Sequence, residues 1–258
     1  MKPMISTLAF LFYLTMTAMA ADVAIIDYAD EWTQVEALGP TLDEMKIKYD
    51  DITDDVIKGN FQLAGYKLFF ICSMATNNST IHSNLDGNAK VIQDFVKEGG
   101  IVIEPTQADQ NEANVDWLPK GLTCVRSDPD LTTVEIVKPD HPLFNTPNKL
   151  KEDDFLNWKY KGWPTVWESI ASQSGFDVLA KSGDRFVILE AEYGEGKFVM
   201  MALAPDKYHV VGNDDYTKKQ ASLFFENLMH AYYLDFQALQ PKGKVSLIWA
   251  ELKLTCRR

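Results

Sequence analysis

The sequence has few basic residues, and they form no cluster. Its 25 Lys and Arg stand against 37 Asp and Glu, which gives a formal net charge of −12. Affinity for nucleic acid depends on clustered Lys and Arg, so we expect no nucleic-acid partner. The same deficit of positive charge makes an anionic membrane surface an unfavourable partner.

Beyond residue 20 the sequence also lacks an apolar run long enough to span a bilayer. One apolar run, residues 5–16, follows Lys2 and precedes the motif AMA at residues 18–20. This pattern is typical of a secretory signal peptide, residues 1–20, cleaved after Ala20. We therefore expect an exported product, secreted or periplasmic, with no transmembrane segment after cleavage.

Cysteine is scarce, and none of it has metal-site spacing. The three cysteines, Cys72, Cys124 and Cys256, include no C-x-x-C pair, and an odd number cannot all pair within one chain. Export would allow a Cys72–Cys124 disulfide. We favour buried, unreactive thiols, because apolar neighbours raise a thiol pKa and disfavour Cys72 as a nucleophile. The sequence indicates no metal and no cofactor.

Apolar residues, in contrast, are abundant at 46%, and aromatic residues make up 12%, enough to bury the core of a folded domain. Apolar runs predict strands at residues 23–27, 67–72 and 101–103, and the alternating pattern of residues 46–52 predicts another. Helical spacing at residues 30–38 and 88–97 lies between them, and residues 73–87 have the composition of a polar loop. The alternation predicts a doubly wound, mostly parallel α/β sheet covered by helices.

The second half of the chain has a different pattern. Strands are predicted at residues 118–125, 132–137, 177–180, 185–191 and 197–204, and several are joined by hairpin-length turns. They are expected to extend the sheet with antiparallel strands. A long helix is predicted over residues 217–239, opened by a capping box of Thr217 and Gln220. One domain over residues 21–240 and a tail over residues 241–258 complete the predicted organisation.

Three short motifs resemble those of a known superfamily. FVKEGGIVI at residues 95–103 resembles a helix, double glycine and strand that lead to a nucleophile elbow, and YGEGKFV at residues 193–199 resembles a hairpin before a last core strand. DHPLF at residues 140–144 resembles a His-Pro motif. Together they resemble the ThuA-like (trehalose-utilisation) branch of the class I glutamine amidotransferase-like superfamily. The resemblance implies a flavodoxin-like, glutamine amidotransferase-like fold over residues 22–235.

The chain differs from this superfamily at the positions of the superfamily's catalytic residues. The elbow requires a Cys after the fourth strand, but this chain has Glu104 and then Pro105, which has no N–H to donate to an oxyanion. The superfamily's His-Pro-Glu follows its last core strand, where this chain reads Ala204, Pro205 and Asp206. Loss of both nucleophile and base argues against glutamine hydrolysis.

Acidic residues follow the first and fourth predicted strands. Asp27 and Glu104 are therefore expected at the carboxyl edge of the sheet, where open α/β sheets bind ligands. With His209, in the segment after the last core strand, they are the candidate catalytic residues for general acid–base chemistry. The alternative is a set of helix caps and solvated acids on a chain that is acidic throughout.

A second set of residues is expected to contact a ligand: Asp30, Thr106, Gln107, His141 and Trp163. The first three border the same sheet edge. His141 is alternatively a turn residue whose imidazole bonds to backbone. Trp163 lies in an aromatic segment with Trp158 and Trp167, whose rings suit stacking on a sugar or, alternatively, packing against the sheet.

The sequence therefore supports two main functional hypotheses. The first is an exported, non-catalytic ThuA-like domain that binds a carbohydrate or other small-molecule ligand, or a partner. The alternative is a carbohydrate-active hydrolase or isomerase that uses Glu104, Asp27 and His209. The alternative requires these three side chains to converge in one cleft. A third hypothesis, a structural module of an envelope assembly, places Trp249 of the tail on an exposed surface.

Overall fold

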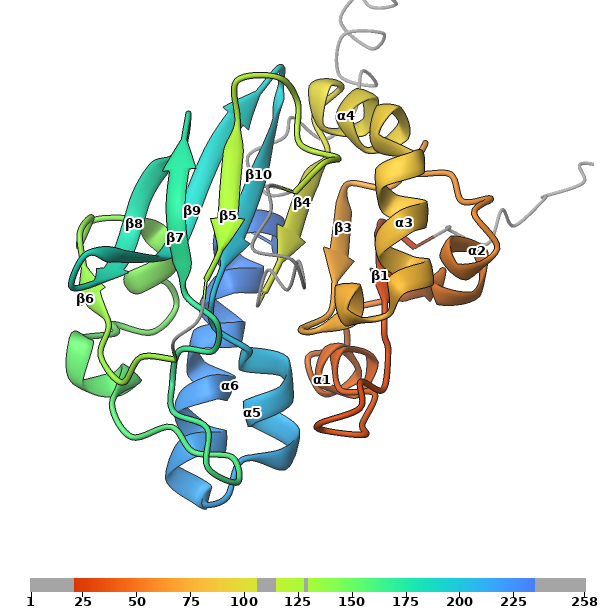
Figure 1. The fold of residues 1–258 in the computed structure, drawn as a ribbon. Coiled ribbons are helices and arrows are strands. Elements are labelled where there is room, and N and C mark those ends of the chain that lie inside the picture. The colour runs from red at the N-terminus through yellow and green to blue at the C-terminus, as the bar shows by residue number, and fades with distance from the viewer. Residues whose placement is uncertain (1–20, 106–114, 128–129, 235–258) are drawn as a thin grey trace, which may run out of the picture.

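The computed structural model describes residues 21–105, 115–127 and 130–234, and within them ten strands form one mixed sheet (Figure 1). The strands are β1 (Val23–Ile26), β2 (Tyr49–Asp51), β3 (Leu68–Ile71), β4 (Ile101–Glu104), β5 (Thr123–Arg126), β6 (Glu135–Ile136), β7 (Ile170–Ser174), β8 (Asp177–Ser182), β9 (Arg185–Tyr193) and β10 (Gly196–Met201). The sheet order is β2-β1-β3-β4-β10-β9-β7-β5, and β8 joins β6 to β9.

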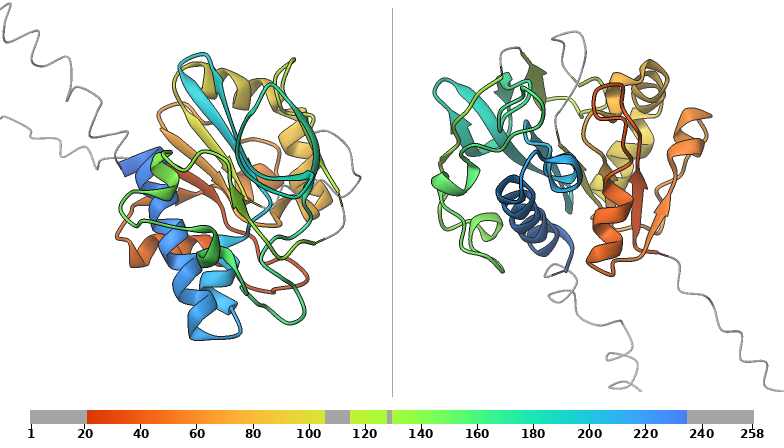
Figure 2. Two further views of the ribbon diagram at one scale, coloured as in Figure 1. Left: turned by 90° about the vertical axis from the view of Figure 1, so that its left-hand side faces the viewer. Right: turned by 90° about the horizontal axis from the view of Figure 1, so that it is seen from below.

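The helices form two groups around this sheet. They are α1 (Leu38–Glu44), α2 (Thr53–Ile57), α3 (Ser79–Gly87), α4 (Ala89–Lys97), α5 (Pro205–Val211) and α6 (Asp215–Met229), with short helical turns η1 (Ala75–Asn77), η2 (Pro142–Phe144), η3 (Glu152–Phe155) and η4 (His230–Leu234). α1 packs on α5 and α5 on α6, whereas α2, α3 and α4 pack in succession on the other side (Figure 2).

The predicted doubly wound parallel sheet is confirmed. β2, β1, β3, β4 and β10 are all parallel neighbours. β1, β3 and β4 are buried along their whole length, which explains why their sequences are unbroken apolar runs. The chain leaves β1 toward β2 and leaves β3 toward β4, so the carboxyl ends of β1 and β3 flank the point at which the winding reverses.

The antiparallel extension is also confirmed. β10 pairs with β9, β9 with β8 and β7, and β7 with β5, all antiparallel. β7 lies in a segment for which no strand was predicted. The predicted strands at residues 118–125 and 132–137 shorten to β5 and β6.

Two of the motifs that carry the resemblance, residues 95–103 and residues 193–199, pack against each other. The Glu195 N–H donates to the Lys97 carbonyl oxygen at 3.1 Å, and the Lys197 N–H donates to the Gly100 carbonyl oxygen at 3.2 Å. A Cβ at Gly196 would lie 2.0 Å from that Gly100 oxygen. The glycines of both motifs therefore allow the β9–β10 turn to approach the end of α4, which is a structural requirement rather than a catalytic one.

Several predicted boundaries were wrong. The predicted helix over residues 30–38 is a loop, and α1 begins only at Leu38, because Pro40 is accommodated in a first helical turn where its missing N–H has no partner to lose. The predicted polar loop over residues 73–87 contains η1 and α3, which Asn78 caps. The long helix begins at Asp215 with Asp214 as its N-cap, so the predicted capping box does not open it.

Cys72 and Cys124 are both buried and form no disulfide with each other, so the alternative of a disulfide between them is wrong. Burial raises the pKa of both thiols, as expected for unreactive core cysteines. Cys256, the predicted signal peptide and the predicted tail lie outside the described residues. No helix within the described ranges has the length and apolar character needed to cross a membrane.

Candidate functional site

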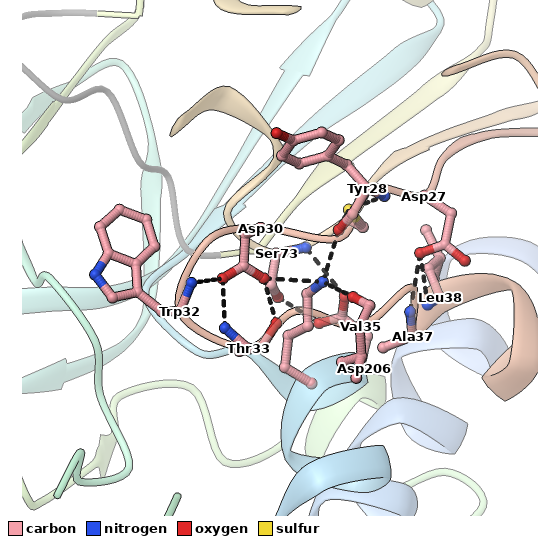
Figure 3. A network of polar contacts seen from close by, with 12 residues as sticks. Asp27, Tyr28, Asp30, Trp32, Thr33, Val35, Ala37, Leu38, Ser73 and Asp206 are labelled. Atoms are coloured by element: carbon pink, nitrogen blue, oxygen red, sulfur yellow. Dashed lines mark hydrogen bonds and ion pairs between the residues drawn. The ribbon is translucent and has the colours of Figure 1, made fainter. Parts of the chain in front are cut away.

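The carboxyl ends of β1 and β3 meet the start of α5, and this junction is where a doubly wound fold places a ligand. The segment from Tyr28 to Ala37, which joins β1 to α1, curls around the carboxylate of Asp30 (Figure 3). Ser73 approaches from the end of β3, and Asp206 and Lys207 approach from the first turn of α5. We call the side chains of Asp30, Ser73, Asp206 and Lys207 the switch-point network.

Lys207 occupies the centre of this network. Its Nζ lies 3.1 Å from Asp30 Oδ2, and both side chains are 0% exposed. It also donates to the carbonyl oxygens of Tyr28 at 2.8 Å and Val35 at 2.6 Å. A lysine ammonium has three donors, so these contacts use all of them. Lys207 is thus fully engaged within the protein.

The charge of Lys207 is stabilised in place. Burial alone lowers the pKa of this amine, but the neighbouring Cys72, Asp206 and Asp30 outweigh burial and raise the pKa above its usual value. Asp30 also accepts hydrogen bonds from the Trp32 and Thr33 N–H groups at 3.0 and 2.8 Å. The pair is therefore hydrogen-bonded on both sides, as a buried ion pair requires.

Asp206, in the first turn of α5, bonds to Ser73 at the end of β3. Its carboxylate accepts the Ser73 N–H at 3.0 Å and the Ser73 hydroxyl. Met74, the next residue, has a φ of 67°, a left-handed conformation uncommon for a side chain of this size. Burial raises the pKa of Asp206, while Lys207 and the Ser73 bonds lower it in part.

Asp27, a predicted catalytic residue, caps α1. Its carboxylate accepts the N–H groups of Ala37, Leu38 and Gly39 at 3.0, 3.1 and 2.7 Å. A negative charge at a helix N-terminus satisfies donors that have no partner within the helix. The structure therefore gives Asp27 the helix-cap role that the sequence analysis left open.

Glu104 and His209 lie in different surroundings. Glu104 ends β4, is buried, and stands in register with Met200. His209 Nε2 lies 2.8 Å from Glu44 Oε2, which links α5 to α1. A hollow of about 380 Å³ beside His209 is bordered by α1, α5, α6 and η4 and is lined by neither Asp27 nor Glu104. The three predicted catalytic side chains therefore have separate sets of neighbours.

The residues predicted to contact a ligand also lie in different parts of the structure. Asp30 belongs to the switch-point network. His141 caps η2, where its Nδ1 accepts the Leu143 N–H at 3.2 Å and its Nε2 lies 3.5 Å from Glu190 Oε2. Thr106 and Gln107 lie outside the described residues. No three His, Cys, Asp or Glu side chains within the described ranges are placed to hold a metal ion.

Trp163 is the predicted contact that reaches the surface. It lies half-buried in the segment between η3 and β7, with ring centroids 6.5 Å from Trp32, 5.9 Å from Tyr160 and 4.8 Å from Trp167. Trp158 and Trp167 are buried, which agrees with packing against the sheet, and stacking of Trp163 on a sugar stays a prediction.

Sequence reasoning missed Lys207, Ser73 and Trp32. A lysine in the first turn of a helix is electrostatically unfavourable, because its charge faces the positive end of the helix dipole. Lys207 has this position, directly after Pro205 and Asp206. The position could have indicated that Lys207 pairs with a buried negative charge. Ser73 and the Trp32 ring had no local signal, because Asp206, which Ser73 bonds to, and Trp163, which the Trp32 ring contacts, are far away in the sequence.

No family model matches this chain, and no curated protein sequence matches it. Solved structures of low sequence identity do resemble it. A cytoplasmic protein from Salmonella typhimurium LT2 is 15% identical, with a TM-score of 0.54 over 81% of this chain and 98% of that one. A protein described as ThuA-like from Bacteroides uniformis is 13% identical, with a TM-score of 0.52 over 85% and 95%.

A glutamine amidotransferase from Thermotoga maritima is 12% identical, with a TM-score of 0.52 over 82% of this chain and 97% of that one. The chain therefore has the flavodoxin-like α/β fold of these proteins. It spans only 31% and 32% of two β-galactosidases, from Rahnella and Bacillus circulans, with TM-scores of 0.46 and 0.47.

Proposed function

We propose that this protein is a ThuA-like member of the glutamine amidotransferase-like superfamily that has no catalytic activity and acts as a binding module. The observation that carries this proposal is the switch-point network. At the junction where the fold would hold a substrate, Lys207 fills the space with all its donors engaged, and Asp206 is bonded to Ser73. No side chain of this network is left to act on a bound molecule.

The competing enzyme hypothesis has less support. General acid–base catalysis requires the acid and the base to reach one substrate at the same time. Asp27 is committed to three N–H groups of α1, and His209 is paired with Glu44. An enzyme would have to dismantle the α1 cap to free Asp27, which would destabilise its own fold.

A turnover experiment tests the proposal. Full-length protein is incubated with glutamine and with a panel of chromogenic glycosides, and ammonia and chromophore release are measured. We expect rates equal to those of the Glu104→Gln and His209→Ala variants. Turnover that either substitution abolishes would establish the enzyme hypothesis instead.

Export is a second part of the proposal and rests on residues 1–20. The full-length gene product is expressed in a bacterial host, the cells are fractionated, and the N-terminus of the product is sequenced. We expect the protein in the periplasm or medium, beginning at Ala21. A cytoplasmic product that still begins at Met1 would contradict export without affecting the proposal about the fold and the binding role.

A further inference from the structure

A shallow hollow lies beside Trp163, between the segment Asn157–Thr165 and the residues that precede β6. It has a volume of about 350 Å³, at the low end of the range of roughly 300–1,000 Å³ for small-molecule sites. Its lining includes Trp163, Asn157, Thr132, Thr133, Lys159 and Lys161. We call it the Trp163 hollow.

The charge of this hollow is opposite to that of the whole protein. The described residues of its lining include two lysines and no carboxylate, although Asp and Glu outnumber Lys and Arg by 37 to 25 in the chain. Outside this lining, the carboxylate of Asp214, the N-cap of α6, interacts with the charge of Lys159. The hollow therefore offers a positive site in a negative field, and such a local inversion favours a small anion over a neutral molecule. A large polyanion would meet repulsion from the surrounding surface.

The segment that forms the hollow is rigidly held from behind. The Tyr208 hydroxyl of α5 donates to the Trp163 carbonyl oxygen at 3.3 Å. The side-chain oxygen of Asn213, before α6, accepts a hydrogen bond from the Lys161 N–H at 3.1 Å. The backbone N–H of Asn213 donates to the Lys159 carbonyl oxygen at 2.8 Å. These anchors fix the backbone of the segment before binding, so less of its conformational entropy is lost on binding.

The backbone of this segment is also strained. Asn157 and Lys161 have φ values of 62° and 52°, and Gln34 of the adjacent loop has a φ of 59°. Lys161 bridges the two loops, since its Nζ donates to the Trp32 carbonyl oxygen at 2.7 Å and lies 4.9 Å from the centre of the Tyr160 ring. Left-handed conformations of non-glycine residues are energetically unfavourable and gather at functional sites.

We propose that the Trp163 hollow binds an acidic saccharide, a small sugar that carries a carboxylate. The indole of Trp163 would pack on the C–H face of the sugar ring. Asn157, Thr132 and Thr133 would bond to its hydroxyl groups, and the ammonium groups of Lys159 and Lys161 would pair with its carboxylate. This inference rests on the proposed binding function and names its ligand class.

Isothermal titration of the full-length protein tests the inference with three acidic saccharides, each matched to an uncharged one: digalacturonate with galactobiose, dimannuronate with mannobiose, and sialyllactose with lactose. At about 50 mM salt we expect at least one acidic saccharide to bind tenfold or more tightly than its uncharged partner. The preference should shrink in 0.5 M salt, because ions screen exposed charges.

Substitutions locate the binding. Lys159→Met should weaken binding of the acidic saccharide about tenfold, Lys159→Arg should restore it, and Lys58→Met on the distant α2 end should leave it unchanged. Trp163→Ala should abolish binding and Trp163→Phe should retain most of it, with melting temperatures recorded to show that each variant folds.

Three results would overturn the inference. Binding of no acidic saccharide, equal binding of charged and uncharged partners, or binding that is insensitive to both Lys159→Met and Trp163→Ala would each do so. These failures are distinct from failure of the proposed function, because only turnover of a substrate would contradict the latter.

Discussion

The switch-point network and the segment around Trp163 differ in how deeply their charged groups are buried. At the parallel edge, Lys207 and Asp30 are fully buried and bonded to each other. Near the antiparallel strands, some charged groups keep contact with solvent: the Lys197 side chain of β10 that pairs with Glu190 is 29% exposed, and Lys159 and Lys161, in the segment before β7, are exposed beside Trp163.

This difference shows where function is to be sought in this fold. The switch point is the usual ligand position of a doubly wound sheet, but here it is filled by the protein's own ion pair. The accessible aromatic and basic groups, Trp163, Lys159 and Lys161, lie in the segment between η3 and β7, outside the parallel strands. The hollow beside Trp163 lies outside these parallel strands, and it is there that an aromatic ring and two lysines line an open surface.

The largest predicted effect tests how tightly the switch point is closed. Lys207→Met should lower the free energy of unfolding by about 3–5 kcal/mol, because it leaves the Asp30 carboxylate buried without a counter-charge. Combining it with Asp30→Leu should recover part of the loss, since a buried pair can be replaced by apolar side chains. Chemical denaturation measures both variants.

The matched control for this prediction is Lys67→Met, which removes an exposed lysine paired with Asp22. Exposed pairs contribute about 0–1 kcal/mol, so this variant should be near wild type. Equal losses for Lys207→Met and Lys67→Met would mean that the switch-point pair is not closed to solvent.

A smaller effect is expected from the charged cluster of the antiparallel part. Burial alone raises the pKa of Glu190, but hydrogen bonds from His141 and Lys197 and the Lys197 charge lower it to about 2. Because the folded pKa lies below the ordinary value of 4.5, this group stabilises the fold above pH 4.5 and loses its effect as the pH falls toward 2.

Glu190→Gln should therefore cost on the order of 2–3 kcal/mol near neutral pH and much less near pH 2. Denaturation curves collected between pH 2 and 7 measure the difference between the variant and the wild type. A difference that stays constant over this range would show that Glu190 does not titrate as its contacts require. Glu192→Gln, on the same strand but exposed, is the control.

The smallest of these effects concerns the α1 cap. Asp27→Ala should cost about 2 kcal/mol, the upper end for a cap, because three N–H groups lose their acceptor. Asp214→Ala, which frees the single Thr217 N–H at the start of α6, should cost about 1 kcal/mol. Thermal melting would compare them, and an unchanged melting temperature for Asp27→Ala would reopen a catalytic role for this carboxylate.

The parts of the fold that local sequence determines were predicted well. β1, β3 and β4 lie within or next to the predicted apolar runs, because strands buried on both faces must be apolar at every position. α4 was predicted from its apolar spacing and the double glycine that ends it. α3 was missed, because its composition is polar and only two of its residues, Ile81 and Leu85, are buried.

The candidate site was predicted by position but not by role. Asp27 and Asp30 were expected at the carboxyl edge of β1, and they do lie there. Asp27 accepts hydrogen bonds from the Leu38 and Gly39 N–H groups, and Asp30 forms an ion pair with Lys207. Sequence spacing cannot show that Lys207, 177 positions after Asp30, is buried beside it.

The sequence by itself determined the class of fold, because the period of its apolar residues reports which faces of each strand are buried. Only the tertiary structure decided what the polar residues at the sheet edge do. A carboxylate can cap a helix, pair with a lysine or meet a ligand, and the choice depends on which distant groups the fold brings within about 3 Å of it.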